Sequence, residues 1–317
     1  MGDRIVGPVP FYEKRKTGNK RNGVMKRTLT YLLLLGLLFC TGCISEDLSG
    51  CPHSFQLDLS YQGDGTTEIF QDKIEHVVLY VFDAADACVE SREATSSELA
   101  LQRVMLRDYP TGNYRVVCVG NARNTMITDP GEVAHEDMRF ADPAWFTGDR
   151  ISTNDSLYHA VTDITITGGR SDRGTAQFAS AHYKMYVEVS GFELDTRMDG
   201  VPTLELHGVL PATDFENQAC EDPVTYYLTT TPYDTSKKMI TSQTNIMRNI
   251  NDETELELLD ASGNSLASVH LPTFLSEHDE IDLTGNEILI PIAFRFKDAD
   301  VEITVPDWYV EDVKPEI

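Results

Sequence analysis

The amino-acid sequence predicts an all-β protein built from two tandem β-sandwich domains. Short segments that alternate between apolar and polar residues recur along the chain, with turn residues between them and few runs of helical periodicity. These segments also fall into two similar sets, which meet at a join that we place near residue 177. Short strands at this spacing are typical of sandwiches.

The first set begins with residues 55–61, FQLDLSY, which alternate as a half-buried strand does. Residues 74–82, IEHVVLYVF, are apolar on both faces, so we expect a central strand there. The set continues with strands at 99–106, 114–119 and 164–167, a long polar loop with a short helix at 122–160, and a glycine-rich loop at 168–174.

The second set begins at Tyr183, where apolar residues alternate with polar ones as far as Ser190. Further strands are predicted at 204–209, 226–230, 239–247, 256–258, 266–271, 288–296 and 301–305. The turn DASGNS separates two of them. Trp308, close to the last strand, is expected to fill a gap in the core.

The N-terminal segment has the pattern of a lipoprotein signal peptide. A short basic start at Met25 precedes an uncharged apolar run at 29–39, which is too short to span a membrane. Gly42 and Cys43 follow, and small residues before a cysteine resemble the site where signal peptidase cuts and the thiol receives diacylglycerol. We therefore expect Cys43 to carry diacylglycerol and an N-acyl chain such as palmitate, and no other cofactor. An ordinary secretory signal is the alternative.

Residues 1–24 are basic and polar, unlike a signal region, so we expect Met25 to be the true start. A genuine extended leader is the alternative. We assign residues 1–42 to the leader and signal, 43–52 to a lipid tether, 53–177 to the first sandwich and 178–317 to the second. Ser45, Glu46 and Asp47 resemble the surface-export signal of Bacteroidetes lipoproteins, which predicts a protein on the outer membrane that faces outward. A simple solvated tether is the alternative.

The chain is strongly acidic after its signal segment. Residues 1–42 hold 8 of the 26 basic and 2 of the 51 acidic residues, so residues 43–317 carry 18 basic and 49 acidic residues, a net charge of −31. Nucleic acid and anionic membrane surfaces both require a basic footprint, so this balance argues against them as partners. It is typical of an exposed protein that repulsion keeps soluble.

Four cysteines remain after Cys43, and they are scattered rather than paired in CxxC motifs. A zinc site is therefore not expected. Cys51 precedes one candidate strand and Cys88 follows the next, so a disulfide joins them if these strands pair antiparallel, in a compartment that permits disulfides. Cys118 and Cys220 are expected to be buried thiols or a second pair.

The sequence contains no nucleophile elbow, zinc-protease motif, phosphate loop or dinucleotide fingerprint. His135 and His278 each precede acidic residues, but in so acidic a chain we interpret both as surface loops. We therefore predict no enzyme activity, and a hydrolase on a β scaffold ranks last. Trp145 and Phe146 are the candidates for stacking on a sugar, which would make the chain a glycan-binding surface lipoprotein; anchoring of their loop on the core is the structural alternative.

Several motifs, in this order, are similar to those of a known family. They are DLSGCP at 47–52, IEHVVLYVFDA at 74–84, GNYRVVCVGN at 112–121, DSLYHA at 155–160, AHYKMYVEVSGF at 181–192, and ILIPIAFRF and VEITVPDW near the end. From Cys43 to the C-terminus the chain resembles the FimB/Mfa-type fimbrial anchor, or minor subunit, family of Bacteroidetes.

The resemblance implies two transthyretin-like β-sandwiches and a place at the base of, or within, a type V surface fimbria. It implies other fimbrial subunits as partners, joined by β-strand addition, in which backbone hydrogen bonds supply affinity and alternating side chains set the register. It also implies a role in adhesion, with a host or bacterial surface as the ligand.

The distribution of basic residues departs from that of polymerising subunits, from which an arginine-specific protease removes the lipidated segment. No Lys or Arg lies between Cys43 and Asp72, and the first arginine is Arg92. We therefore expect the lipid and the first strand to stay attached, as an anchor requires. The segment 301–313 is expected to engage a neighbouring subunit, and Pro306 within it favours an edge strand.

Overall fold

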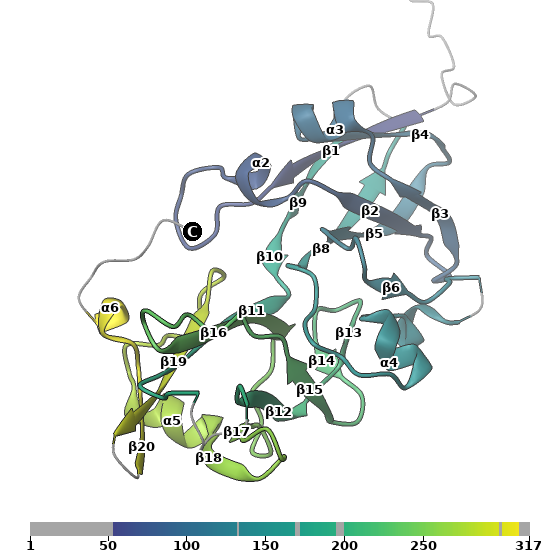
Figure 1. Ribbon diagram of the computed structural model, residues 1–317. Helices are drawn as coiled ribbons and strands as arrows, with labels where there is room; N and C mark the ends of the chain where they lie inside the picture. Colours follow the sequence, from purple (N-terminus) through teal and green to yellow (C-terminus); the bar gives the residue numbers. More distant parts are fainter. Residues whose placement is uncertain (1–52, 132, 169–171, 195–199, 298–299, 311–317) are drawn as a thin grey trace, which may run out of the picture. The chain divides into compact units, whose positions relative to one another are not determined.

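The computed structural model describes residues 53–310 except 132, 169–171, 195–199 and 298–299. The described chain is formed mostly of β-strands arranged in several sheets, with short helices between them (Figure 1). The predicted all-β sandwich fold is confirmed. No helix among these residues has the length and apolar character needed to cross a membrane.

The first sandwich contains a three-stranded sheet in the order β4-β1-β9. Its strands are β1 (His53–Ser60), β4 (Arg103–Tyr109) and β9 (Asp172–Gln177). β1 lies in the middle, antiparallel to β4 and parallel to β9. Its alternation decides which side faces inward, because Phe55, Leu57 and Leu59 are buried while the residues between them point outward.

The facing sheet of the first sandwich has five antiparallel strands in the order β10-β8-β5-β2-β3. Its strands are β2 (Val77–Phe82), β3 (Cys88–Glu93), β5 (Gly112–Gly120), β8 (Tyr158–Ile166) and β10 (Ala179–Ser180). The central position predicted for residues 74–82 is confirmed, since β2 lies between β5 and β3. The inner faces of both sheets form one hydrophobic cluster that contains Leu57, Leu79 and Val116.

The predicted strand at 99–106 is wrong in its first half. The helix α3 (Ser96–Leu101) occupies that part, and β4 begins only at Arg103. Thr95 caps the helix: its side chain accepts from the backbone of Glu98, whose carboxylate accepts from the backbone of Thr95. The sequence carries this signal as Thr95-x-x-Glu98, a capping box. The short helix α2 (Phe70–Lys73) precedes β2.

The assumption behind the predicted Cys51–Cys88 disulfide is also wrong. The strands next to the two cysteines do not pair, because β1 and β2 belong to different sheets. Cys51 lies outside the described residues, so the disulfide itself stays a prediction. The Cys88 thiol donates to the carbonyl of Glu90 at 3.3 Å.

A further sheet covers the outer face of the five-stranded sheet, in the order β14-β13-β7-β6. It is formed by β6 (Met126–Ile127), β7 (Arg139–Ala141), β13 (Ala212–Asp214) and β14 (Ala219–Cys220). β7 and β13 come from distant parts of the sequence and pair antiparallel. A second buried cluster, which includes Tyr80, Phe82, Phe140 and Phe215, lies beneath this covering sheet. The apolar outer face of β2 is explained by this cover.

The segment predicted as a long polar loop at 122–160 is thus an ordered connection. It contains the 3-10 helix η3 (His135–Asp137) and the helix α4 (Pro143–Thr147), in addition to β6 and β7. Asp155 holds the start of the segment in place, because its carboxylate accepts from the backbone N–H groups of Arg123, Asn124 and Thr125 at 2.7–2.9 Å.

The second sandwich packs two four-stranded sheets, in the orders β16-β11-β19-β20 and β15-β12-β17-β18. The first sheet contains β11 (His182–Ser190), β16 (Met239–Met247), β19 (Leu289–Lys297) and β20 (Asp300–Thr304), and the second contains β12 (Thr203–Val209), β15 (Val224–Leu228), β17 (Glu255–Leu259) and β18 (Ser265–His270). The helices α5 (Leu271–Glu277) and α6 (Asp307–Val310) follow β18 and β20.

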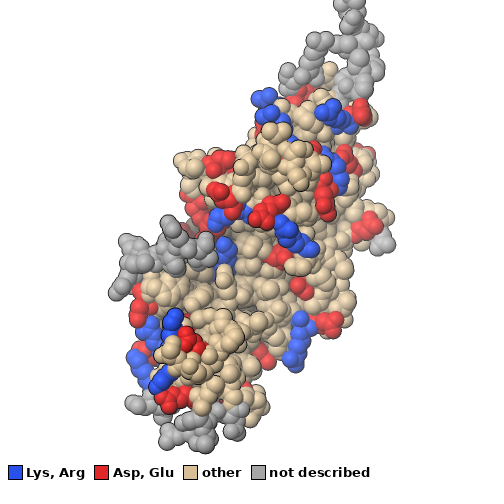
Figure 2. All heavy atoms as spheres, turned by 45° about the horizontal axis from the view of Figure 1, so that its top comes forward, with Lys and Arg blue, Asp and Glu red and all other residues tan. Residues whose placement is uncertain are grey.

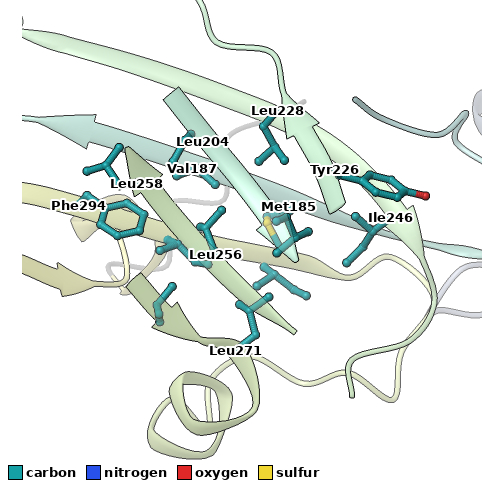
Figure 3. Close-up of a cluster of buried hydrophobic side chains, with 14 of the residues drawn as sticks. Met185, Val187, Leu204, Tyr226, Leu228, Ile246, Leu256, Leu258, Leu271 and Phe294 are labelled. Carbon is teal, nitrogen blue, oxygen red and sulfur yellow. The ribbon is translucent and has the colours of Figure 1, made fainter. Parts of the chain in front are cut away.

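Alternating residues from both sheets fill the core of the second sandwich (Figure 3). Met185, Val187 and Phe294 of one sheet face Leu204 and Leu256 of the other in one cluster. Each such side chain contributes about 1.5–3 kcal/mol when it leaves water. One glycine is obligatory here: Gly208 has φ 73° in the irregular part of β12, and a Cβ on it would lie 2.2 Å from the carbonyl oxygen of Glu253.

The two sets of strands are connected by more than the chain itself. Ile151, from the segment between β7 and β8, belongs to the core of the second sandwich. Asn154 donates to the hydroxyl of Tyr226 at 2.8 Å. The division at residue 177 stays a prediction, while the covering sheet and this segment show strong packing across it.

Candidate functional site

The residues predicted for lipid attachment and export lie outside the described part of the chain. They are Gly42, Cys43, Ser45, Glu46 and Asp47. The expected buried thiols are found in part: Cys118 is buried and Cys220 is half-buried, and both are free thiols. Burial raises the pKa of Cys118 to about 12 and that of Cys220 to about 11, so neither is a ready nucleophile.

The two histidine–acid clusters differ from each other. His278 lies near the surface with Glu280, at 3.0 Å, as predicted. The surface interpretation of His135 is wrong, because its ring is buried against Phe82 and Phe215. The described residues contain no group of three or more His, Cys, Asp and Glu that could hold a metal ion.

Trp145 and Phe146 do not form a free aromatic platform. Trp145 packs against the core of the second sandwich, and its ring contacts that of Phe146 edge-on at 4.7 Å. Phe146 is 36% exposed. The alternative interpretation, a loop anchored on the core by its aromatic residues, explains this arrangement, although the segment forms the short helix α4.

Both sandwiches are closed on one side. In the first, the chain passes from β9 in one sheet to β10 in the other through buried Phe178, whose backbone donates to Ser60 at 2.8 Å. In the second, Thr230 bridges to Ser242 and so connects the end of β15 with β16. The other sides end in edge strands, and these edges are the candidate docking sites.

The open side of the first sandwich ends in β3 and β4, and no described strand pairs with their outer edges. The inward-facing residues of β3 are charged: Glu90 lies opposite Val81, and Arg92 lies opposite Leu79. Arg92 donates to Glu90 at 2.7 Å and to both oxygens of Glu98 on α3. We call these three residues the β3 ion network.

Electrostatics hold the β3 ion network in its charged form. Burial alone would raise the pKa of Glu98, but hydrogen bonds from Arg92 and Thr95 outweigh it and lower that pKa to about 2. The hydroxyl of Tyr109 on β4 donates to Glu90, and burial together with this bond raises the tyrosine pKa. Inward-pointing charges on an edge strand discourage a further strand from pairing there.

The open side of the second sandwich ends in β18 and β20, and again the described chain adds no strand to either outer edge. Here the inward-facing residues of β20 are apolar. Val301 lies opposite Phe296 and Ile303 opposite Phe294, and both half-buried side chains pack against the core. The prediction that this final segment forms an edge strand is confirmed.

The chain then turns back over the outer face of its own sheet. Pro306 ends the strand pattern, and α6 follows. Trp308 contacts Tyr186 edge-on at 5.4 Å, and Asp307 pairs with Arg295 at 2.9 Å. The expectation that Trp308 fills the core is wrong, because Tyr186 lies on the outer face, between inward-facing Met185 and Val187.

A half-buried carboxylate connects the first sandwich with the loop before β19. Glu287 accepts from the hydroxyls of Tyr61 at 2.5 Å and Tyr158 at 3.2 Å, and it pairs with Lys73 at 2.8 Å. Burial would raise its pKa, but the bonds from Lys73 and Tyr61 lower it. These contacts join the residue after β1, the helix α2 and the strand β8 of the first sandwich to the loop that precedes β19.

Sequence analysis missed β3 and its ion network. Residues 88–93, CVESRE, are polar at most positions, so their periodicity does not indicate a strand. The capping box at Thr95 and Glu98 was the available signal, since a helix start there makes the preceding residues the end of another element.

Comparison with known proteins identifies the family. Residues 48–314 match the model of the family described as fimbrillin-A associated anchor proteins Mfa1 and Mfa2. A comparison with curated protein sequences gives no match.

Solved structures share the fold. The fimbrial anchor protein Mfa2 from Porphyromonas gingivalis is similar with a TM-score of 0.62 and 14% identity, over 81% of this chain and 98% of that one. A candidate adhesin from Bacteroides ovatus gives 0.66 and 17%, over 81% and 95% of the chains. A candidate polysaccharide-binding protein from Bacteroides thetaiotaomicron gives 0.65 and 16%, over 81% and 96%. The family match covers most of the chain, which therefore belongs to the fimbrillin-A associated anchor proteins Mfa1 and Mfa2.

Proposed function

We propose that this chain is a surface-exposed outer-membrane lipoprotein that anchors a type V fimbria or forms its minor subunit, and so supports adhesion. The family match over residues 48–314 is the observation that carries the proposal. A fimbrial component needs to connect a membrane attachment at one end with a subunit contact elsewhere. The signal segment and the edge strands supply candidates for these two functions.

The membrane attachment is the lipid on Cys43. The apolar run at 29–39 and Gly42 before the cysteine support cleavage and lipidation at this position. Ser45, Glu46 and Asp47 support export to the outer surface. Only residues 44–52 lie between the lipidated cysteine and His53, where β1 begins.

Retention of this attachment is supported by the location of the first basic residues. Lys73, the first after Cys43, lies on α2 and pairs with Glu287 at 2.8 Å. Arg92, the first arginine, is part of the β3 ion network and its side chain is 28% exposed. A protease that cuts after basic residues needs an extended, accessible segment. We infer that the N-terminal segment stays covalently joined to the folded chain.

The subunit contact is strand addition at the outer edge of β20. An added strand hydrogen-bonds to the free backbone edge and places alternate side chains over the apolar face. Val301 and Ile303 continue that face to the edge, whereas the β3 ion network interrupts it on the other sandwich. Residues 301–305 also pack on the core, so deletion of the whole segment would test folding rather than docking.

A substitution that copies the charge of β3 onto β20 tests the contact. We expect Val301→Glu to reduce the fimbrial subunits that co-purify with the protein from native outer membrane by about tenfold or more, since one charge on an edge strand blocks pairing. Val89→Glu is the matched control, because Val89 lies on β3, the edge strand that carries the ion network, and is 49% exposed. Full co-purification with Val301→Glu, in a protein that melts normally, would overturn the β20 contact.

The lipid anchor is tested separately by the intact mass of the native protein with N-terminal peptide mapping. We expect a diacylated Cys43 still joined to residues 44–92. An unlipidated N-terminus within that range would show that the segment is removed, as in a polymerising or tip subunit.

The glycan-binding alternative gains no support from Trp145, because this side chain packs against the core of the second sandwich. A binding test with Trp145→Ala on a glycan array distinguishes the two functions. Loss of glycan binding in a folded variant would favour the alternative.

A further inference from the structure

Most of the basic residues that the structure describes pair with a carboxylate. Figure 2 shows basic and acidic side chains interspersed over the face in view. Among the Lys and Arg residues that the structure describes, Arg150 and Arg248 lie over tyrosine rings and the others pair with carboxylates, apart from three. Among the described residues, Arg107, Arg173 and Lys237 have neither a carboxylate within ion-pair distance nor an aromatic ring beneath the charged group.

Two of these three lie on one surface, the outer face of the β4-β1-β9 sheet. Arg107 on β4 is opposite Ser54 of β1, and Arg173 on β9 is opposite Gln56. Both arginines are exposed, and their partners Ser54 and Gln56 alternate along β1 with Phe55 and Leu57, which are buried in the first core. Strand spacing and rise place their Cα atoms roughly 12 Å apart, so together they fit an array of anions better than one small ion.

The charge of this face is graded along β1. At its far end, Asp58 neutralises Arg103 at 3.0 Å, and Ser60 donates to Glu68 at 2.6 Å. The unpaired arginines lie at the other end, beside Ser54 and Gln56. The basic end is therefore next to His53, where the proposed lipid tether enters the fold.

We propose that this basic face docks on the anionic headgroup phosphates of the membrane that holds the Cys43 lipid. The proposal rests on the lipid attachment described above. Ten residues, 43–52, span at most about 35 Å, so the start of β1 stays within that distance of the lipid and meets the headgroups repeatedly. Guanidinium groups bind phosphate oxygens in a bidentate fashion, and each basic residue close to an anionic surface favours binding.

The acidic net charge of the chain does not prevent this docking. Exposed charges farther apart than about 8 Å are largely screened at physiological ionic strength, so the local face rather than the total decides the contact. The composition predicted no anionic membrane partner, because a net charge does not show that two unpaired arginines lie on the same face of one sheet.

Radical footprinting of the lipidated protein on vesicles tests the proposal. Met105 lies on the same face, opposite Gln56, and is half-buried. We expect hydroxyl radicals to oxidise Met105 at least about threefold more slowly on phosphatidylcholine vesicles with about 30% phosphatidylglycerol than on pure phosphatidylcholine. Met126, which is 45% exposed on β6, is the internal reference and should not change.

Arginine variants and salt separate docking from other causes of protection. Each of Arg107→Gln and Arg173→Gln should lower the docking equilibrium about fivefold, and about 0.5 M NaCl should abolish it. Lys237→Gln is the matched control and should leave Met105 protected. All three side chains are exposed, so the variants should melt like the parent.

Two results overturn the proposal: equal oxidation of Met105 on both vesicles, or protection that persists in high salt or in the double Arg107→Gln, Arg173→Gln variant. The intact mass of the same sample distinguishes this failure from that of the proposed function. If Cys43 carries lipid and Met105 is unprotected, only the docking is wrong. If Cys43 carries no lipid, the anchor and the docking fail together.

Discussion

The edges of the two sandwiches occupy similar places and have opposite chemistry. On the first, β3 directs Glu90 and Arg92 inward, where they meet Glu98. On the second, β20 directs Val301 and Ile303 inward, onto Phe296 and Phe294. Both strands are the last of their sheets among the described residues.

This difference shows that an edge is made available or unavailable by the side chains on its core face. Backbone groups on the outer edge are the same in any strand, so they cannot select a partner. An apolar core face lets an added strand bury its own apolar residues. On a charged core face, an added strand would have to break existing ion pairs, which costs free energy. The comparison can be tested in four ways.

The largest loss of stability is expected when the buried side chain that lies opposite each edge strand is truncated. Phe294 is fully buried opposite Ile303, and Leu79 is fully buried opposite Arg92. Phe294→Ala should lower the free energy of unfolding by about 3–5 kcal/mol and Leu79→Ala by about 2–5 kcal/mol, measured in urea.

The two variants should differ in local opening. Phe294→Ala should make the bond after Lys297 sensitive to trypsin, because β20 then loses its apolar contact. Leu79→Ala should leave Arg92 protected, since the ion network still holds β3. Equal cleavage at the two edges would show that the ion network does not hold β3 independently.

Lowering the pH should destabilise the protein in two separate pH ranges. Burial lowers the pKa of His159 and of His182 to about 4 from 6.5. As the pH falls, both histidines therefore become protonated in the unfolded chain before they do so in the folded protein. Their contribution is complete above pH 6.5 and is lost as the pH falls toward 4, at up to about 1.4 kcal/mol per pH unit for each histidine. His159→Gln should make the free energy of unfolding depend less steeply on pH, measured between pH 7 and pH 4.

The second pH range concerns the first edge alone. The pKa of Glu98 is lowered to about 2, so its contribution is present above pH 4.5 and is lost as the pH falls toward 2. Hydrogen exchange should then rise in β3 before it rises in β20, and Glu98→Gln should remove the difference. Simultaneous opening of both edges would contradict a specific role of Glu98.

A smaller change in stability, but a change in association, is expected when β3 is made to resemble β20. The triple variant Glu90→Leu, Arg92→Leu, Glu98→Gln removes all three charges of the β3 ion network together, so no charge loses its partner, which should cost less than about 1.5 kcal/mol. It should dimerise in light scattering through its new apolar edge. The control is Ser91→Leu, Glu93→Leu, which adds the same apolar groups on the other face. Association of the control would show that hydrophobicity alone is responsible.

The smallest effect is expected at the C-terminal helix. Trp308→Ala should lower the free energy of unfolding by about 1 kcal/mol, the worth of one edge-on aromatic pair with Tyr186. Asp307→Asn should cause no measurable change, because its ion pair with Arg295 is at the surface. A larger loss in either would mean that α6 supports β20 more firmly than these contacts indicate.

The sequence predicted most of the strands because their pattern is local. Residues 74–82 and 183–190 show which side chains face a core, and the structure buries them accordingly. The same local logic fails at CVESRE, where partners from α3 and β4 satisfy the charges. It also fails at 122–160, where β7 pairs with residues of β13 more than 70 positions away.

The sequence by itself determined the all-β class, the acidic surface, the pattern of a lipoprotein signal and the resemblance to fimbrial anchors. Only the tertiary structure decided which strands share a sheet, that β1 lies parallel to β9, and that β3 and β20 end with charged and apolar core faces. It also decided where the unpaired arginines gather. The physical reason is that strand order and charge pairing are set by contacts between residues far apart in the chain, and periodicity reports only which side of a strand is buried.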